Sequence, residues 1–293
     1  MIKNIKSNNI KKTQIQDNSI ENKEHITTTN IEPIVKPDVD TSIPLNKTPN
    51  KNTFAVIIGN EEYQNEIFVN YALNDAIIFK EYVTKTLGVP IDQVHLVKNA
   101  SYGMILREIE WLKNIAKAYN GEAKLIFYYA GHGMPDNKTK GSYILPVDGD
   151  ASQIITAIEL DKLYQSLNKH QTKQATVIID ACFSGSSRNG MLTTGRGVTI
   201  VPKKNVINGN LVVFSAVSGE QTSHPYTEKS HGLFTYYFLK KLQETKGEVT
   251  YKELSDYVLK EVSRRSAIRG EEQTPKVNVS YEILESWKKW TFN

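Results

Sequence analysis

Cysteine is nearly absent from this chain, since Cys182 is the only one among 293 residues. A lone cysteine excludes an intrachain disulfide and a zinc site built from several cysteines. A free cysteine is then either a small buried hydrophobic side chain or a reactive thiol. The residues around Cys182 have to decide between these two roles.

Long apolar runs are also missing, because no stretch approaches the roughly 20 residues that are needed to cross a bilayer. The first six residues lead into a polar stretch and not into the apolar core of a secretion signal. A reducing compartment also suits a free thiol. We therefore expect a cytoplasmic protein without membrane contact.

A strong excess of one charge is absent as well, since the net charge is +4 at pH 7. Lysine and arginine are scattered, which does not form the basic patch typical of nucleic-acid-binding proteins. No phosphate-binding glycine motif follows a predicted strand, which disfavours a nucleotide-binding protein. Nucleic acid is therefore not an expected partner.

The chain divides into two parts at about residue 52. Residues 1–52 are rich in Asn, Lys, Thr, Ile and Pro without a sustained period, which predicts a flexible N-terminal extension. Residues 53–293 alternate strand and helix patterns, which predicts one α/β domain with a mostly parallel sheet of six or more strands flanked by helices. The predicted strands are 54–58, 94–97, 124–129, 177–180, 211–215 and about 276–279, and the predicted helices are 73–87, 104–118, 160–167, 233–242 and 251–263.

Cys182 comes directly after an apolar strand. Val177, Ile178 and Ile179 form a β-branched run typical of a strand buried on both faces, and the Ser and Gly residues after Phe183 cannot continue it. In open α/β sheets, ligands bind beyond the carboxyl ends of the parallel strands. This position favours a reactive thiol over a packing residue.

Among the six histidines, His132 has the most similar setting. It follows the predicted strand 124–129 and lies between Gly131 and Gly133, which allow a sharp turn and a close approach of substrate. Neighbouring parallel strands would bring His132 and Cys182 to one edge of the sheet, where the imidazole can serve the thiol as a base. The others are His25 in the extension, His95 inside a strand, His170 at a helix end, and the two main competitors, His224 and His231, beside a loop.

Five sequence blocks in order resemble the caspase-like cysteine peptidases of family C14, and among them the metacaspases and bacterial orthocaspases. These blocks are residues 54–60, 73–76, 129–133, 180–185 and 232–235. The resemblance extends from about Phe54 to Leu284, and His132 precedes Cys182 by about 50 residues, as in caspases. It implies the caspase-like (caspase-hemoglobinase) fold and a cysteine endopeptidase with a His132–Cys182 dyad.

The dyad would work by nucleophilic catalysis. His132 takes the proton of Cys182, the thiolate attacks the peptide carbonyl, and water hydrolyses the acyl-enzyme. The backbone N–H groups of Gly133 and Cys182 are the expected donors to the oxyanion, because both lie at strand-end turns. This chemistry requires no cofactor.

The resemblance also implies a substrate pocket, since metacaspase-like enzymes share an aspartate two residues before the cysteine, here Asp180. With Asp75 it would line a pocket for arginine or lysine, and two partly desolvated carboxylates favour a cation. We therefore expect protein or peptide substrates with a basic residue, and not aspartate, before the cleaved bond. Each residue also has a structural alternative, because Asp75 suits a helix N-terminus and Asp180 could satisfy backbone donors.

A segment rich in Gly, Ser, Thr and basic residues, about 186–210, predicts an exposed linker loop. In caspase-like enzymes this region joins the two halves of the catalytic domain and can be cut during activation. The candidate self-cleavage residues are Arg188, Arg196, Lys203 and Lys204. Basic loop residues are common, so the alternative is that they are ordinary surface residues.

Calcium is a cofactor of some relatives, and Asp148, Asp150 and Asp161 carry oxygens that could bind it. The sequence has no dense Asp/Asn loop, and turn chemistry equally explains Asp148 and Asp150. The functional alternative to a peptidase is a catalytically silent caspase-like interaction module. Such a scaffold need not retain His132 and Cys182, which favours the peptidase.

Overall fold

The computed structural model describes residues 36–293 apart from 137, 184–185, 188–189, 192–206 and 219–220. Within these residues, the central element is a six-stranded sheet in the order β13-β10-β7-β3-β1-β2. Its strands are β1 (Thr53–Gly59), β2 (Val94–Lys98), β3 (Lys124–Ala130), β7 (Gln174–Asp180), β10 (Leu211–Ser215) and β13 (Lys276–Val279). The described strands pair in parallel except β13, which is antiparallel to β10, so the predicted mostly parallel sheet is confirmed.

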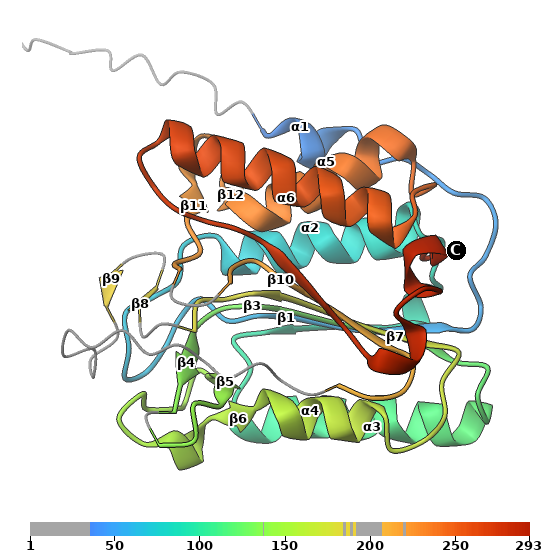
Figure 1. Cartoon of the computed structure of the whole chain (residues 1–293), viewed down its shortest axis with the longest axis horizontal. Coiled ribbons are helices and arrows are strands. Elements are labelled where there is room, and N and C mark those ends of the chain that lie inside the picture. The colour runs from blue at the N-terminus through green and yellow to red at the C-terminus, as the bar shows by residue number, and fades with distance from the viewer. Residues whose placement is uncertain (1–35, 137, 184–185, 188–189, 192–206, 219–220) are drawn as a thin grey trace, which may run out of the picture. The chain divides into compact units, whose positions relative to one another are not determined.

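Helices cover both faces of this sheet (Figure 1). One face carries α2 (Ala72–Lys85), α5 (Leu233–Thr245) and α6 (Tyr251–Ile268), and the other carries α3 (Tyr102–Tyr119) and α4 (Leu160–Leu167). Alternate strand residues face opposite sides, so β1 contributes Ala55 and Ile57 to one core and Val56 and Ile58 to the other. Burial on both faces explains the continuous apolar runs that identified these strands. None of the described helices is both long and apolar enough to cross a membrane.

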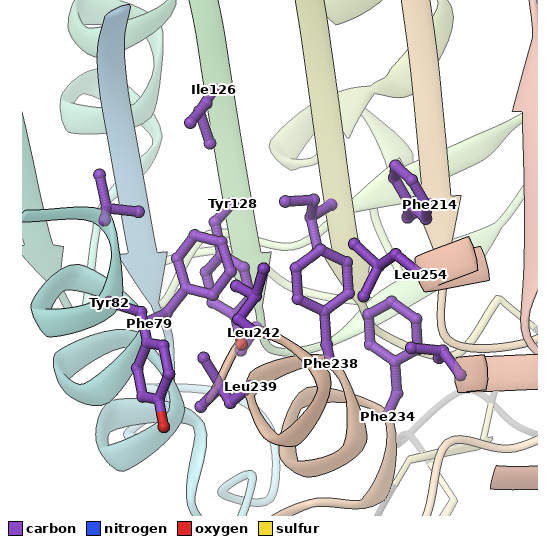
Figure 2. Packing of buried hydrophobic residues seen from close by; sticks show 14 of the residues in the cluster. Phe79, Tyr82, Ile126, Tyr128, Phe214, Phe234, Phe238, Leu239, Leu242 and Leu254 are labelled. Carbon is purple, nitrogen blue, oxygen red and sulfur yellow. The ribbon is translucent and has the colours of Figure 1, made fainter. Parts of the chain in front are cut away.

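Aromatic side chains join α2 and α5 to the sheet (Figure 2). Phe79 of α2 stacks on Tyr128 of β3 with ring centroids 4.2 Å apart, and Phe238 of α5 lies 6.0 Å from Phe79. The hydroxyl of Tyr128 makes a 2.8 Å hydrogen bond with Thr235 Oγ1 in the first turn of α5. These contacts fix the N-terminal end of α5 against the strand that leads to His132.

Short strands and 3-10 helices lie in the connections between these elements, and the sequence did not predict them. Two or three residues carry too little pattern to be recognised as a strand. They comprise the strands β4 (Gly133–Pro135), β5 (Ser142–Ile144), β6 (Ile158–Glu159), β8 (Ser186–Ser187), β9 (Gly190–Met191), β11 (Pro225–Tyr226) and β12 (His231–Gly232), and the 3-10 helices η1 (Ile91–Gln93), η2 (Ile154–Thr156), η3 (Thr227–Lys229), η4 (Tyr281–Ile283) and η5 (Trp287–Lys289).

Residues 36–52, which the sequence pattern assigned to the N-terminal extension, belong to the same compact unit as the sheet. The short helix α1 (Asp38–Thr41) buries Val39 completely, and the hydroxyl of Tyr82 donates to the Val39 carbonyl at 2.9 Å. Asn50 donates to the carbonyl of Phe292 at 2.7 Å. The sequence did not reveal this packing because one buried valine and a few polar contacts produce no periodic pattern.

Candidate active site

The strand register brings His132 and Cys182 to equivalent positions. Strands β3 and β7 are parallel neighbours, and Ala130 is paired with Asp180. Each of the two expected catalytic residues lies two positions beyond its member of this pair. The N–H of Gly131 also donates to the Asp180 carbonyl at 3.3 Å, which extends the pairing past the strand ends. The two side chains therefore start from the same edge of the sheet.

Gly133 allows the two strand ends to come into contact. A Cβ atom on Gly133 would overlap the Cys182 carbonyl oxygen and would lie 2.7 Å from a ring carbon of Phe183. Any larger residue would force the backbone of β4 away from the backbone at Cys182. The sequence predicted that this glycine allows a substrate to approach closely. In the structure, the group that approaches it is the protein's own backbone at Cys182.

The imidazole of His132 is oriented by a backbone carbonyl. Its Nε2 lies 2.6 Å from the carbonyl oxygen of Ile67, which can only accept, so Nε2 carries the proton and donates. The ring also packs against Tyr63 with centroids 4.5 Å apart, and the His132 backbone N–H donates to the Tyr63 hydroxyl at 2.8 Å. In this tautomer Nδ1 is the basic nitrogen.

Cys182 is buried, and its sulfur accepts a hydrogen bond from the backbone N–H of Ser223 at 2.8 Å. A donor at this position favours the thiolate, whereas burial opposes charge on the sulfur. Sequence reasoning did not find Ser223, because it lies 41 residues after Cys182 in a segment without a strand or helix pattern.

Ser223 also contacts the first of the expected pocket residues, Asp180. The Ser223 hydroxyl donates to Asp180 Oδ1 at 2.6 Å, and Thr235 donates to Oδ2 from its hydroxyl at 2.7 Å and from its backbone N–H at 3.2 Å. Asp180 is fully buried, so these donors compensate for its lost hydration. Asp180 therefore accepts a hydrogen bond from a backbone donor, which was the structural alternative expected from the sequence.

Asp75 is likewise fully buried, in the first turn of α2. Its two oxygens both lie 3.1 Å from the N–H of Gly232, and Oδ1 lies 2.7 Å from Nδ1 of His231. Asp75 and Asp180 thus both contact the stretch from Ser223 to Thr235, which leads from the loop after β10 into α5. The two aspartates are brought to one segment from two different elements.

The competing histidines both face carboxylates. His231 lies between Asp75 and Asp40, with Nε2 2.7 Å from Asp40 Oδ1. Burial lowers the pKa of His231, but its hydrogen bonds with the two aspartates raise the pKa to about 9 overall. His224 Nδ1 lies 3.7 Å from Glu271, and burial lowers the pKa of His224.

The calcium candidates do not come together. Among the described residues, no three His, Cys, Asp or Glu side chains are grouped so that they could hold a metal ion. Asp148 instead accepts the N–H of Tyr102 at 2.8 Å, and Asp150 accepts the N–H of Ser152 at 2.7 Å. The Asp150 contact is the local turn role expected from the sequence, whereas Asp148 binds the first residue of α3 from 46 positions away, and Asp161 lies in the first turn of α4.

The expected self-cleavage residues, by contrast, lie outside the described residues. They are Arg188, Arg196, Lys203 and Lys204.

Comparison with known proteins identifies the caspase-like fold that was expected from the sequence. The family model of the caspase domain, peptidase family C14, matches residues 52–281. A structural-genomics target protein from Geobacter sulfurreducens is 18% identical, with 82% of this chain and 97% of that chain covered and a TM-score of 0.59. Caspase-1 from Spodoptera frugiperda is 16% identical, with 82% and 90% covered and a TM-score of 0.54. The comparison with curated proteins gives no match.

Proposed function

Because the chain belongs to the caspase-domain family of peptidases, we propose that it is a cysteine endopeptidase that cleaves after arginine or lysine through His132 and Cys182. The observation that carries this proposal is the strand register, which places the two residues at matching positions beyond β3 and β7. A silent scaffold of the same fold would share this register but would not need a histidine and a cysteine at the two positions.

Each step of the reaction has a group suited to it. Nδ1 of His132 accepts the thiol proton while Ile67 holds the opposite nitrogen, and the Ser223 N–H stabilises the thiolate. The thiolate attacks the substrate carbonyl, and the N–H groups of Gly133 and Cys182 receive the oxyanion. The imidazolium then protonates the leaving amine, and water releases the acyl group with His132 again as the base.

The preference for a basic residue is supported by buried negative charge. Asp75 and Asp180 are both fully buried and contact one segment, so a pocket bounded by that segment would favour a cation. A guanidinium group can in addition form paired hydrogen bonds with a carboxylate. An aspartate in the same pocket would be repelled and poorly solvated.

The test is a fluorogenic peptide panel that varies only the residue before the cleaved bond, run with and without a calcium chelator. We expect cleavage after Arg and Lys, none after Asp, and only background turnover by Cys182→Ala. His132→Gln should lower kcat about 10²–10⁴-fold, the usual contribution of a general base. His170→Gln is the matched control, because His170 lies between α4 and β7, at the opposite end of β7 from Cys182, and should be dispensable. Preferred cleavage after Asp would overturn the specificity.

The scaffold alternative is tested by covalent chemistry. An Arg-directed electrophilic peptide should label Cys182 in the wild type and leave Cys182→Ala unlabelled. Failure to label the folded wild type would favour a catalytically silent module.

Self-cleavage is part of the proposal, with Arg188, Arg196, Lys203 and Lys204 as the candidate sites in the linker. Incubation of the wild type beside Cys182→Ala, followed by mass spectrometry, should give fragments that end at one of these residues only in the wild type. Identical fragments from both proteins would assign the cuts to another protease.

A further inference from the structure

His231 is a buried residue for which the proposed reaction has no use. Its side chain is fully buried, and its two ring nitrogens each lie 2.7 Å from a carboxylate oxygen, Asp75 on α2 and Asp40 on α1. A carboxylate accepts hydrogen bonds, so an imidazole that satisfies both partners must carry both protons and a positive charge. A further titratable group near the ring is the phenol of Tyr236 on α5, with ring centroids 6.4 Å apart.

Asp40 reaches His231 because residues 37–42 are docked on the domain. Asp38 forms 2.9 Å ion pairs with both Lys229 and Lys240, and Gln243 donates to the Asp38 carbonyl at 2.8 Å. The neighbouring Val39 is fully buried. These contacts come from side chains of η3 and α5. They hold the segment at a defined position on the domain.

On the other side, His231 and Gly232 hold the carboxylate of Asp75, which the proposed function assigns to the substrate pocket. We propose that His231 is a positioning residue for this pocket and that the docked segment 37–42, through Asp40, keeps it in its working state. The segment then acts as a latch. With Asp40 in place the ring is fixed and charged, Asp75 is held, and a basic side chain is bound; without it, Asp75 loses its fixed partner and binding weakens. This inference rests on the proposed function.

Asp40→Asn tests the latch, because asparagine keeps the shape and a hydrogen-bond acceptor but removes the charge. We expect the KM for an Arg peptide to rise about tenfold with kcat nearly unchanged, the pattern of lost substrate binding. Asp38→Asn, which does not contact His231, should weaken docking and give a smaller rise. Asp92→Asn is the matched control, because Asp92 is exposed in η1 and should leave KM unchanged.

Two readouts independent of turnover separate this inference from the proposed function. In a Cys182→Ala background, Asp40→Asn should weaken binding of agmatine, a small guanidinium compound, about tenfold in calorimetry. NMR titration of the His231 ring should show a lower pKa in Asp40→Asn than in its parent. Unchanged agmatine affinity and KM in Asp40→Asn, or no agmatine binding by the parent, would overturn the role of His231. Loss of agmatine affinity in a protein that cleaves no Arg or Lys peptide would instead overturn only the peptidase.

Discussion

At the scale of single residues, Ser223 connects the proposed nucleophile, Cys182, with the expected specificity residue, Asp180. Its backbone N–H donates to the Cys182 sulfur, and its hydroxyl donates to Asp180. The second bond fixes the loop that supplies the first. A change at the side chain should therefore be felt at the thiol.

Ser223→Ala should raise the pKa of the Cys182 thiol and lower kcat/KM about tenfold, because the N–H donor loses its anchor. It should also lower the free energy of unfolding by about 1–3 kcal/mol, the usual cost of an unsatisfied buried acceptor. Ser223→Thr keeps the hydroxyl and is the control. The pH profile of alkylation by iodoacetamide measures the thiol, and an unchanged profile in Ser223→Ala would contradict the coupling.

Gly133 is a second residue whose size matters. Gly133→Ala should abolish most activity and destabilise the fold by about 1–3 kcal/mol, because its Cβ would overlap the Cys182 carbonyl. The control is Gly103→Ala in α3, where a Cβ meets nothing within 4 Å. That change should stabilise by about 0.5–1 kcal/mol, since alanine is the better helix former. Urea unfolding compares the two, and equal effects would refute the steric explanation.

At the scale of elements, α2 depends on its aromatic contact with β3. Phe79→Ala should cost about 3–5 kcal/mol, the range for a large buried aromatic residue, because it removes the ring stacked on Tyr128. Ile77→Ala on the same helix is the control, since Ile77 is 37% exposed and should cost about 1 kcal/mol or less. Thermal unfolding of both variants measures the difference; similar costs would show that the stack is not what holds α2.

The elements that the sequence predicted well are those with a local signal. Runs such as 177–179 are apolar because both faces of the strand are covered, and His132 and Cys182 were found because each closely follows such a run. The contacts of Ser223 with Cys182 and of His231 with Asp40 span 41 and 191 residues. Hydrogen bonds over such separations leave no mark in a single sequence, which is why Ser223, Asp40 and α1 were not predicted and why His231 was considered only as a competitor of His132.

At the scale of the whole molecule, His231 makes stability depend on pH. Its pKa is raised from 6.5 to about 9 in the folded protein, so between these values the folded state binds a proton that the unfolded state lacks. Its contribution is therefore complete below pH 6.5 and is lost as pH rises through 9. The full span corresponds to about 3 kcal/mol.

We therefore expect the free energy of unfolding to fall more steeply between pH 7 and 9 in the wild type than in His231→Gln. Urea unfolding at several pH values measures both slopes. Parallel curves for the two proteins would show that His231 does not carry the raised pKa.

The docked segment 37–42 is joined to β1 by a short stretch of chain, and this connection governs how easily it can be exchanged. A tethered ligand sees its site at an effective concentration in the mM range, which a free competitor in solution rarely matches. An acidic peptide added in solution should therefore displace the segment poorly. One cut in the connecting stretch, residues 43–52, would remove this effective concentration, and the released segment would then dissociate at the low concentration of the protein itself. The connecting stretch contains the exposed residues Lys47 and Lys51. A peptidase with the proposed specificity for basic residues could therefore cut its own connecting stretch and release the segment.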